Sequence, residues 1–213
     1  MELLKYDIKF KIVLLGAHKT GTSSIILRYC FPEKFLADFN TFYFGMNEYG
    51  IKMIKVNNKK IKLYLWDNPP KGYVCFFQVP KREYNFRFQY KGAHGFIFIY
   101  DISNKESFEF IKEKINDMKS YEKKYSLNNN IPKILIGNKC DIEIAQRCMD
   151  ASEAKKFAKE NGMEYFEISA INDINVNEAF ECLINQMIKI NDEDENYSKG
   201  FNLYKAKKKF GCF

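Results

Sequence analysis

A glycine-containing stretch near the start of the chain has residue types that can surround a phosphate group. It follows residues 8–15, which predict a buried strand, and it precedes residues 24–29, which predict the start of a helix. Backbone N–H groups at the N-terminus of a helix point toward an anion. We therefore expect a phosphate-binding loop made of Gly16, Ala17, His18, Lys19, Thr20, Gly21, Thr22, Ser23 and Ser24.

The loop departs from the usual pattern at the position of the cationic residue. The pattern G-x-x-x-x-G-K-[ST] keeps both glycines and the serine, but Thr22 stands at the lysine position. A charge-assisted hydrogen bond contributes roughly 1.5–3 kcal/mol, so its loss weakens binding by about ten- to a hundredfold. Two interpretations of Lys19 stay open. It either supplies the missing ammonium as a flexible point charge or is a solvated loop lysine.

A second motif indicates which nucleotide the phosphate would belong to. Asn138-Lys139-Cys140-Asp141 follows an apolar run over residues 134–136. The Asp141 carboxylate can accept hydrogen bonds from the N1–H and the exocyclic amine of guanine, whereas adenine presents the wrong donors. The stem of Lys139 can lie along the purine, and Asn138 can tie neighbouring loops together. These residues favour a guanine nucleotide.

Over roughly residues 8–190 the chain resembles the Rab branch of the Ras-like small GTPases. Trp66-Asp67 matches the start of that family's W-D-T-A-G-Q motif, residues 91–101 resemble its R-G-A-H-G and the following strand, and residues 167–170 resemble its guanine-contacting S-A loop. The resemblance implies GTP or GDP and Mg²⁺ as cofactors, with Ser23 and Asp67 serving the metal. It also implies base contacts from Asn138, Lys139, Asp141, Ser169, Ala170 and Ile171, the last of which replaces a family lysine.

The length and element pattern predict a single α/β domain followed by a tail. Strand-like and helical stretches alternate along the 213 residues, which predicts a three-layer P-loop (Ras-like) domain, with a mostly parallel sheet and helices on both faces. We expect this domain over residues 1–190 and a flexible tail over 191–213. Ser103 and Asp150 are predicted helix caps. The six cysteines are scattered, which favours reduced thiols.

The motif that senses the γ-phosphate in the family is changed. D-T-A-G-Q becomes Asp67-Asn68-Pro69-Pro70-Lys71. Pro70 has no N–H to give a phosphate, and Lys71, which replaces the glutamine, cannot accept a hydrogen bond from an attacking water. The family's metal-binding threonine also lacks a secure counterpart, because counting places Tyr43 or Phe44 there and the nearest threonine is Thr41. No catalytic residue is assigned, and hydrolysis, if present, is expected to be slow.

Two segments are candidates for contacts with partners or membranes. Residues 73–90 are rich in aromatic and basic side chains, which either form a partner surface or fold back onto the domain. Tyr49 and Trp66 match effector-binding positions of Rab proteins or simply pack between strands. The tail turns from acidic at residues 192–195 to basic at 205–209, and Cys212 is a candidate lipidation site. No nucleic-acid module is recognised.

Two functions from different classes follow. The first is a Rab-like GTP-binding protein in vesicle-mediated transport, in the cytoplasm and at the cytoplasmic face of intracellular membranes. The second is a pseudo-GTPase scaffold that is recruited to membranes and binds partners without a nucleotide switch. The intact guanine motif favours the first, and the missing lysine, glycine and glutamine favour the second.

Overall fold

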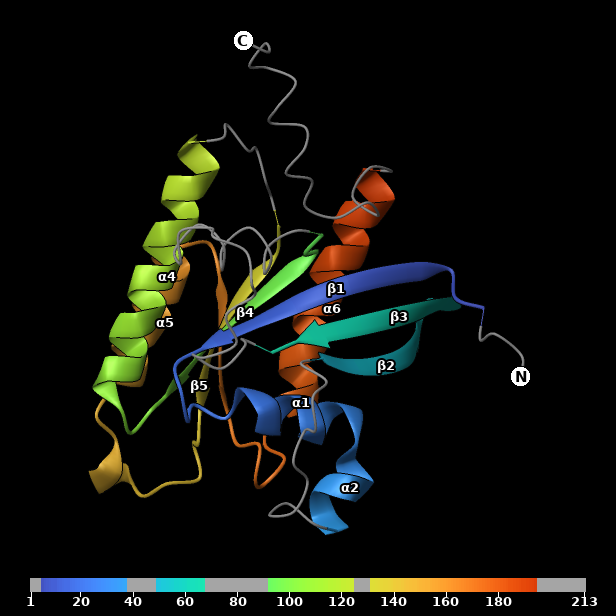
Figure 1. Ribbon diagram of the computed structural model, residues 1–213. Coiled ribbons are helices and arrows are strands. Elements are labelled where there is room, and N and C mark those ends of the chain that lie inside the picture. Colours follow the sequence, from blue (N-terminus) through green and yellow to red (C-terminus); the bar gives the residue numbers. More distant parts are fainter. Residues whose placement is uncertain (1–4, 38–48, 68–91, 125–130, 195–213) are drawn as a thin grey trace, which may run out of the picture.

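The computed structural model describes residues 5–37, 49–67, 92–124 and 131–194. Its centre is a six-stranded sheet in the order β2-β3-β1-β4-β5-β6 (Figure 1). β2 runs antiparallel to β3, and every other neighbouring pair is parallel. The strands are β1 (Ile8–Gly16), β2 (Tyr49–Val56), β3 (Lys59–Trp66), β4 (Gly95–Asp101), β5 (Lys133–Asn138) and β6 (Glu164–Ile168).

Helices cover both faces of the sheet, which confirms the predicted α/β class. One layer holds α1 (Thr22–Cys30) and α6 (Val176–Glu193), and the other holds α4 (Lys105–Lys124) and α5 (Ala151–Glu160) (Figure 1). The short helix α2 (Pro32–Ala37) follows α1, and a 3₁₀ turn spans Ile144–Gln146. Within the described ranges, no helix combines the length and the apolar character needed to cross a membrane.

The two helical layers enclose two apolar cores, one on each face of the sheet. Alternate residues of a strand point to opposite faces, so Phe10, Ile12 and Leu14 of β1 pack under α1 and α6. Val13 and Leu15 belong to the core beneath α4 and α5. Each fully buried aliphatic or aromatic side chain contributes about 1.5–3 kcal/mol. The part of β1 that leads into the phosphate loop is therefore packed on both sides.

Helix starts agree only in part with the predicted caps. The side chain of Asp150 accepts a hydrogen bond from the Ser152 N–H at 2.7 Å, as predicted. At α4 the prediction was wrong by one residue, because Asn104, not Ser103, accepts from the Glu106 N–H at 2.9 Å. The Ser103 hydroxyl instead donates to Asp101 at 2.6 Å.

The element bounds also shift slightly from the predicted ones. α1 begins at Thr22 rather than at residue 24, so the phosphate loop runs directly into the helix. α6 continues to Glu193, past the predicted domain boundary at residue 190. The division into a domain and a flexible tail stays a prediction, since residues 195–213 lie outside the described part of the chain.

Candidate functional site

The carboxyl ends of the parallel strands bring the sequence motifs to one edge of the sheet. Gly16 ends β1, Asp67 follows β3, Asp101 ends β4 and Asn138 ends β5. Ser169 follows β6. In open α/β sheets this edge is where ligands bind. The topology therefore gathers the predicted phosphate, metal and base residues in one region.

The loop after β1 has the turned backbone of a phosphate cradle. Lys19 and Gly21 adopt left-handed conformations, with φ of 67° and 90°. Backbone N–H groups in such turns form concavities that bind anions. The buried Thr20 closes the loop, since its hydroxyl donates to the Ala17 carbonyl at 2.8 Å.

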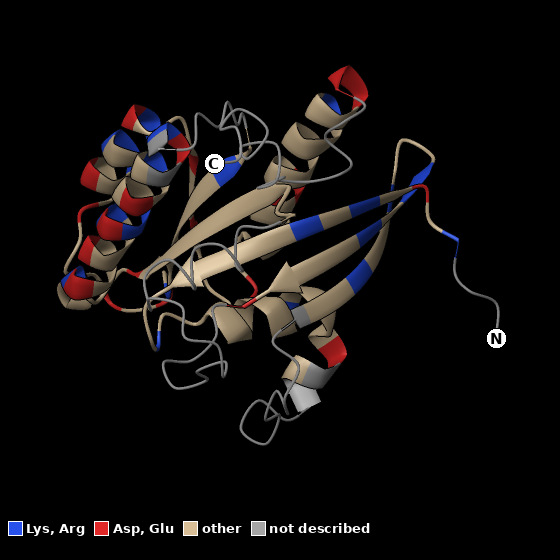
Figure 2. Ribbon diagram, turned by 45° about the horizontal axis from the view of Figure 1, so that its top comes forward, with Lys and Arg blue, Asp and Glu red and all other residues tan. Residues whose placement is uncertain are grey.

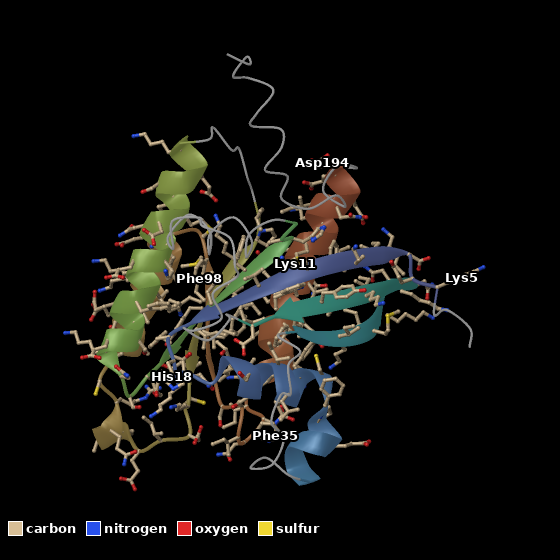
Figure 3. All side chains as sticks on the ribbon, in the orientation of Figure 1. Lys5, Lys11, His18, Phe35, Phe98 and Asp194 are labelled. Carbon is tan, nitrogen blue, oxygen red and sulfur yellow. The ribbon has the colours of Figure 1, made fainter. Side chains whose placement is uncertain are left out.

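Both loop glycines are required by close contacts. A Cβ at Gly16 would lie 2.4 Å from the Thr20 hydroxyl oxygen and 2.8 Å from the Thr22 methyl carbon. A Cβ at Gly21 would lie 2.4 Å from the Asn138 amide nitrogen. The Thr22 side chain therefore lies back against the start of the loop. His18 and Lys19 are exposed, and Figure 3 shows His18 on the loop between β1 and α1.

The two predicted metal residues lie together. The Ser23 hydroxyl, in the first turn of α1, donates to an Asp67 carboxylate oxygen at 2.5 Å. A hydroxyl and a carboxylate are oxygen ligands that suit Mg²⁺, which usually takes its remaining ligands from water and substrate phosphates. The described residues contain no group of three acidic, histidine or cysteine side chains that could hold a metal by themselves. The donor set therefore fits a magnesium ion shared with a phosphate.

Asn138 joins the phosphate loop to the loop after β6. Its side chain is buried, and its amide donates to the Thr20 carbonyl at 2.8 Å. The Ala170 N–H points at its amide oxygen from 3.4 Å. This confirms the expectation that Asn138 ties loops together, and it connects the predicted phosphate loop to the predicted base loop.

Lys139 has a partner that the sequence analysis missed. Its ammonium donates to the Asp101 carboxylate at 2.6 Å. Burial alone would raise the pKa of Asp101, but hydrogen bonds from Lys139 and Ser103 hold it below its usual value. The ion pair fixes the ammonium, and contact between the lysine stem and a purine stays a prediction. Asp101 could have been found from its position at the end of an adjacent parallel strand.

The loop after β6 is buried and hydrogen-bonded at its base and exposed at its tip. Ser169 is fully buried and exchanges backbone hydrogen bonds with Ile174 at 3.1 and 3.0 Å. Its hydroxyl accepts from the Asn172 N–H at 3.0 Å. Ile171 is 56% exposed. Asp141 is also exposed, so its carboxylate is accessible for a base.

Arg28 is a second residue that the sequence analysis missed. Its side chain is buried and donates to the Ala170 carbonyl at 2.7 Å and to the Ile171 carbonyl at 2.5 Å. Its guanidinium lies 3.7 Å from the ring centroid of Phe35, which Figure 3 shows on α2. Arg28 thus connects α1, α2 and the predicted base loop. The only sequence signal was an arginine inside an apolar helical stretch.

Several predicted features lie outside the described residues. They are Thr41, Tyr43 and Phe44, Pro70 and Lys71, the aromatic segment 73–90, and Cys212. Tyr49 and Trp66 are direct partners in the backbone register of β2 and β3, and the choice between an effector contact and packing between strands stays open.

Comparisons with known proteins agree with this geometry. The model of the Ras family matches residues 11–189. The chain is 36% identical over 183 residues to Ras-related protein Rab-1 of Theileria parva, which covers 84% of this chain and 74% of the relative. It is 35% identical over 184 residues to Ras-related protein Rab-2B of Dictyostelium discoideum, with 86% and 83% covered. It is also 35% identical over 185 residues to Ras-related protein Rab-13 of Bos taurus, with 86% and 82% covered. The chain therefore belongs to the Ras family and is a Rab-like small GTPase.

Proposed function

We propose that this protein binds a guanine nucleotide together with Mg²⁺ and acts in vesicle-mediated transport at the cytoplasmic face of intracellular membranes. The observation that carries the proposal is the double contact of Asn138, which holds the phosphate loop and the base loop as one unit. A relative that is 34% identical over 176 residues is named GTP-binding protein YPTM1, from Zea mays.

Each part of the site has a distinct role in this proposal. The backbone of residues 16–24 surrounds the phosphates, and Ser23 and Asp67 hold the metal beside them. Asp141 selects guanine by accepting hydrogen bonds from the N1–H and the exocyclic amine of the base, while Asn138 and Lys139 position the surrounding loops. Ser169, Ala170 and Ile171 line the base side.

Lys19 replaces the missing loop lysine in this proposal. A residue with a side chain costs about 1–2 kcal/mol in the left-handed region, where glycine is tolerated freely. Lys19 occupies that region and is exposed. The loop therefore accepts strain at the position where an ammonium on a flexible stem can reach the phosphates.

Binding of GDP, GTP and ADP tests the choice of nucleotide. A ligand present at about 100 times its Kd stabilises the folded protein by about 2.7 kcal/mol. We expect GDP and GTP, but not ADP, to raise the melting temperature and to give calorimetric binding. Asp141→Ala should remove most of this preference. Equal binding of GDP and ADP would contradict the proposal.

Two variants test the cation. Lys19→Gln should weaken GDP binding by about tenfold, and Thr22→Lys should tighten it by about ten- to a hundredfold when Lys19 is absent. Lys105→Gln, which removes an exposed lysine at the start of α4, is the matched control. If Lys19→Gln binds GDP like the control, the ammonium of Lys19 does not serve the phosphates.

The alternative function, a pseudo-GTPase scaffold, rests on Thr22, Pro70 and Lys71. It predicts that neither GDP nor GTP binds. The proposed function predicts binding with slow turnover, because Pro70 offers no N–H and Lys71 no acceptor. Single-turnover hydrolysis of radiolabelled GTP, compared with a Rab that keeps D-T-A-G-Q, measures this difference.

Membrane recruitment is proposed to use the tail. Lys205 and Lys207 to Lys209 each add about 1 kcal/mol at an anionic surface, and a lipid on Cys212 would supply the second signal. Mass spectrometry of the native C-terminus would detect that lipid. Liposome flotation of Cys212→Ser and of a variant with the four lysines neutralised separates the two contributions.

Effectors are proposed to bind the switch regions and the aromatic segment 73–90.

A further inference from the structure

Four lysines gather on one face of the sheet, at the end farthest from the phosphate loop. Lys9 lies at the start of β1, Lys60 and Lys62 at the start of β3, and Lys55 at the end of β2. Lys9, Lys55 and Lys60 are exposed, and Lys62 is partly exposed. Figure 2 shows the corresponding basic bands on β1, β2 and β3, away from α4 and α5. We call these four residues the lysine face.

The strand register places the lysines directly opposite one another. Lys9 of β1 pairs with Lys62 of β3, and Lys55 of β2 pairs with Lys60 of β3. Their strand neighbours Phe10 and Ile61 point to the opposite side, into the core under α1 and α6. Like charges directly opposite each other destabilise a sheet. The chain therefore keeps two adjacent repulsive pairs where a single substitution would remove either of them.

Aromatic and apolar groups lie among the ammonium groups. The Lys62 ammonium is 5.1 Å from the ring centroid of Tyr64 and 5.5 Å from that of Tyr6. The Lys9 ammonium is 5.9 Å from the same Tyr64 ring. Tyr6 and Ile51 are 43% and 38% exposed. The rings hold the charges in place through cation–π contacts and give the face an apolar component.

Two acidic side chains make contacts at the start of β3, next to this face. The Asp7 carboxylate accepts the Lys60 N–H at 2.6 Å, and Asp192 pairs with Lys59 at 2.7 Å. Residues 68–91 contain one acid, Glu83, against several lysines and arginines, and residues 205–209 are basic. The four ammonium groups of the lysine face therefore suit a partner surface of opposite charge.

We propose that the lysine face binds an acidic segment of a partner protein, independently of the nucleotide. Neighbouring strands lie about 4.8 Å apart and alternate residues about 6.6–6.8 Å apart, so a short peptide can bring its carboxylates to all four lysines. A protein that makes about 6–10 phosphate contacts with DNA needs more cationic groups than the four of this face. The exposed Tyr6 and Ile51 suit the apolar side chains of a peptide. The face goes beyond the proposed nucleotide function, because it lies at the opposite end of the sheet.

Binding of a fluorescein-labelled hexaglutamate peptide to the full-length protein tests the proposal by fluorescence anisotropy at low ionic strength. Lys9→Gln/Lys62→Gln should weaken binding by about tenfold. Lys155→Gln/Lys156→Gln, two exposed lysines of α5, is the matched control and should change it by less than about twofold. A variant with neutralised tail lysines removes any contribution from residues 205–209. The affinity should be the same with and without GDP, so failure of nucleotide binding leaves this test intact.

Two results would overturn the proposal. One is unchanged peptide binding by Lys9→Gln/Lys62→Gln. The other is a failure to bind the peptide while a DNA duplex, or phosphatidylserine vesicles, bind in a way that the same variant abolishes.

A measurement without any ligand gives a second check. Lys55→Glu replaces a repulsive cross-strand pair with an attractive one, so it should raise the melting temperature by about 1–3 °C. Lys155→Glu on α5 is the control and should not raise it. A fall in melting temperature for Lys55→Glu would show that the face is not strained by its charges, and it would remove the basis of the proposal.

Discussion

Asn138 uses both ends of its carboxamide, one on each of two loops. Asn138→Ala leaves the Thr20 carbonyl and the Ala170 N–H without this partner in a buried region. An unsatisfied buried group costs about 1–3 kcal/mol, so we expect a loss of that order in the free energy of unfolding, measured in urea without nucleotide. Asn172→Ala, an exposed asparagine in the loop after β6, is the control. Equal stability of the two variants would contradict the role of Asn138 as a tie.

Two opposing effects determine the pKa of Asp101. Burial raises the pKa of this carboxyl, and hydrogen bonds from Lys139 and Ser103 more than reverse the effect. Because its folded pKa lies below its unfolded value of 3.8, its stabilising contribution is complete above that pH. The contribution is lost as the pH falls through the lower folded value.

Replacing Lys139 tests which effect dominates. In Lys139→Gln the strongest opposing hydrogen bond is lost while burial remains, so the pKa of Asp101 should rise. NMR titration of the side-chain carboxyl carbons measures it. Asp150, whose pKa is lowered by the Ser152 N–H, is an internal control that should not change. If the pKa of Asp101 did not change, the hydrogen bonds from Ser103 would be what keeps this pKa low.

Arg28 of α1 connects three elements, because it contacts both α2 and the loop after β6. Arg28→Met keeps an apolar stem against Phe35 but leaves the Ala170 and Ile171 carbonyls without their donors. We expect faster hydrogen exchange at residues 169–174 and release of a fluorescent GDP analogue that is about tenfold faster. Arg28→Lys retains a single ammonium and should give an intermediate effect. If residues 169–174 of Arg28→Met exchanged their amide hydrogens at the wild-type rate, the loop after β6 would not depend on Arg28 for its structure.

The central strands and the grouping of the motifs at one edge of the sheet could be predicted from local sequence patterns. Apolar runs define β4 and β5, and parallel connections put residues 16–23, 67, 138 and 169 at one edge of the sheet. Arg28 could not be assigned a role, because the carbonyl groups it donates to are 142 and 143 residues away in the sequence. The cap of α4 was misplaced because serine and asparagine are adjacent there and both are good caps.

Across the whole molecule, the two ends of the sheet carry different chemistry. The carboxyl ends of the strands hold backbone amides, Ser23, Asp67 and Asn138, which suit a nucleotide. The other end carries the lysine face. Lys11 lies between them on β1, as Figure 3 shows, with its ammonium 4.5 Å from the Trp66 ring centroid. Its backbone is fixed on the buried His94 through hydrogen bonds of 3.0 and 2.7 Å.

The position of Lys11 predicts how the stability of the whole domain depends on pH. Burial lowers the pKa of Lys11 from 10.5 to about 8. Between these values the unfolded chain binds more protons at this residue than the folded one, so its contribution to stability rises with pH. We expect the stability of the wild type relative to Lys11→Met to increase from pH 8 to pH 10.5, measured by urea unfolding. Taking the difference between the two proteins cancels the tyrosines and cysteines that titrate in the same range. A constant difference would mean that the contact with Trp66 keeps the lysine charged throughout.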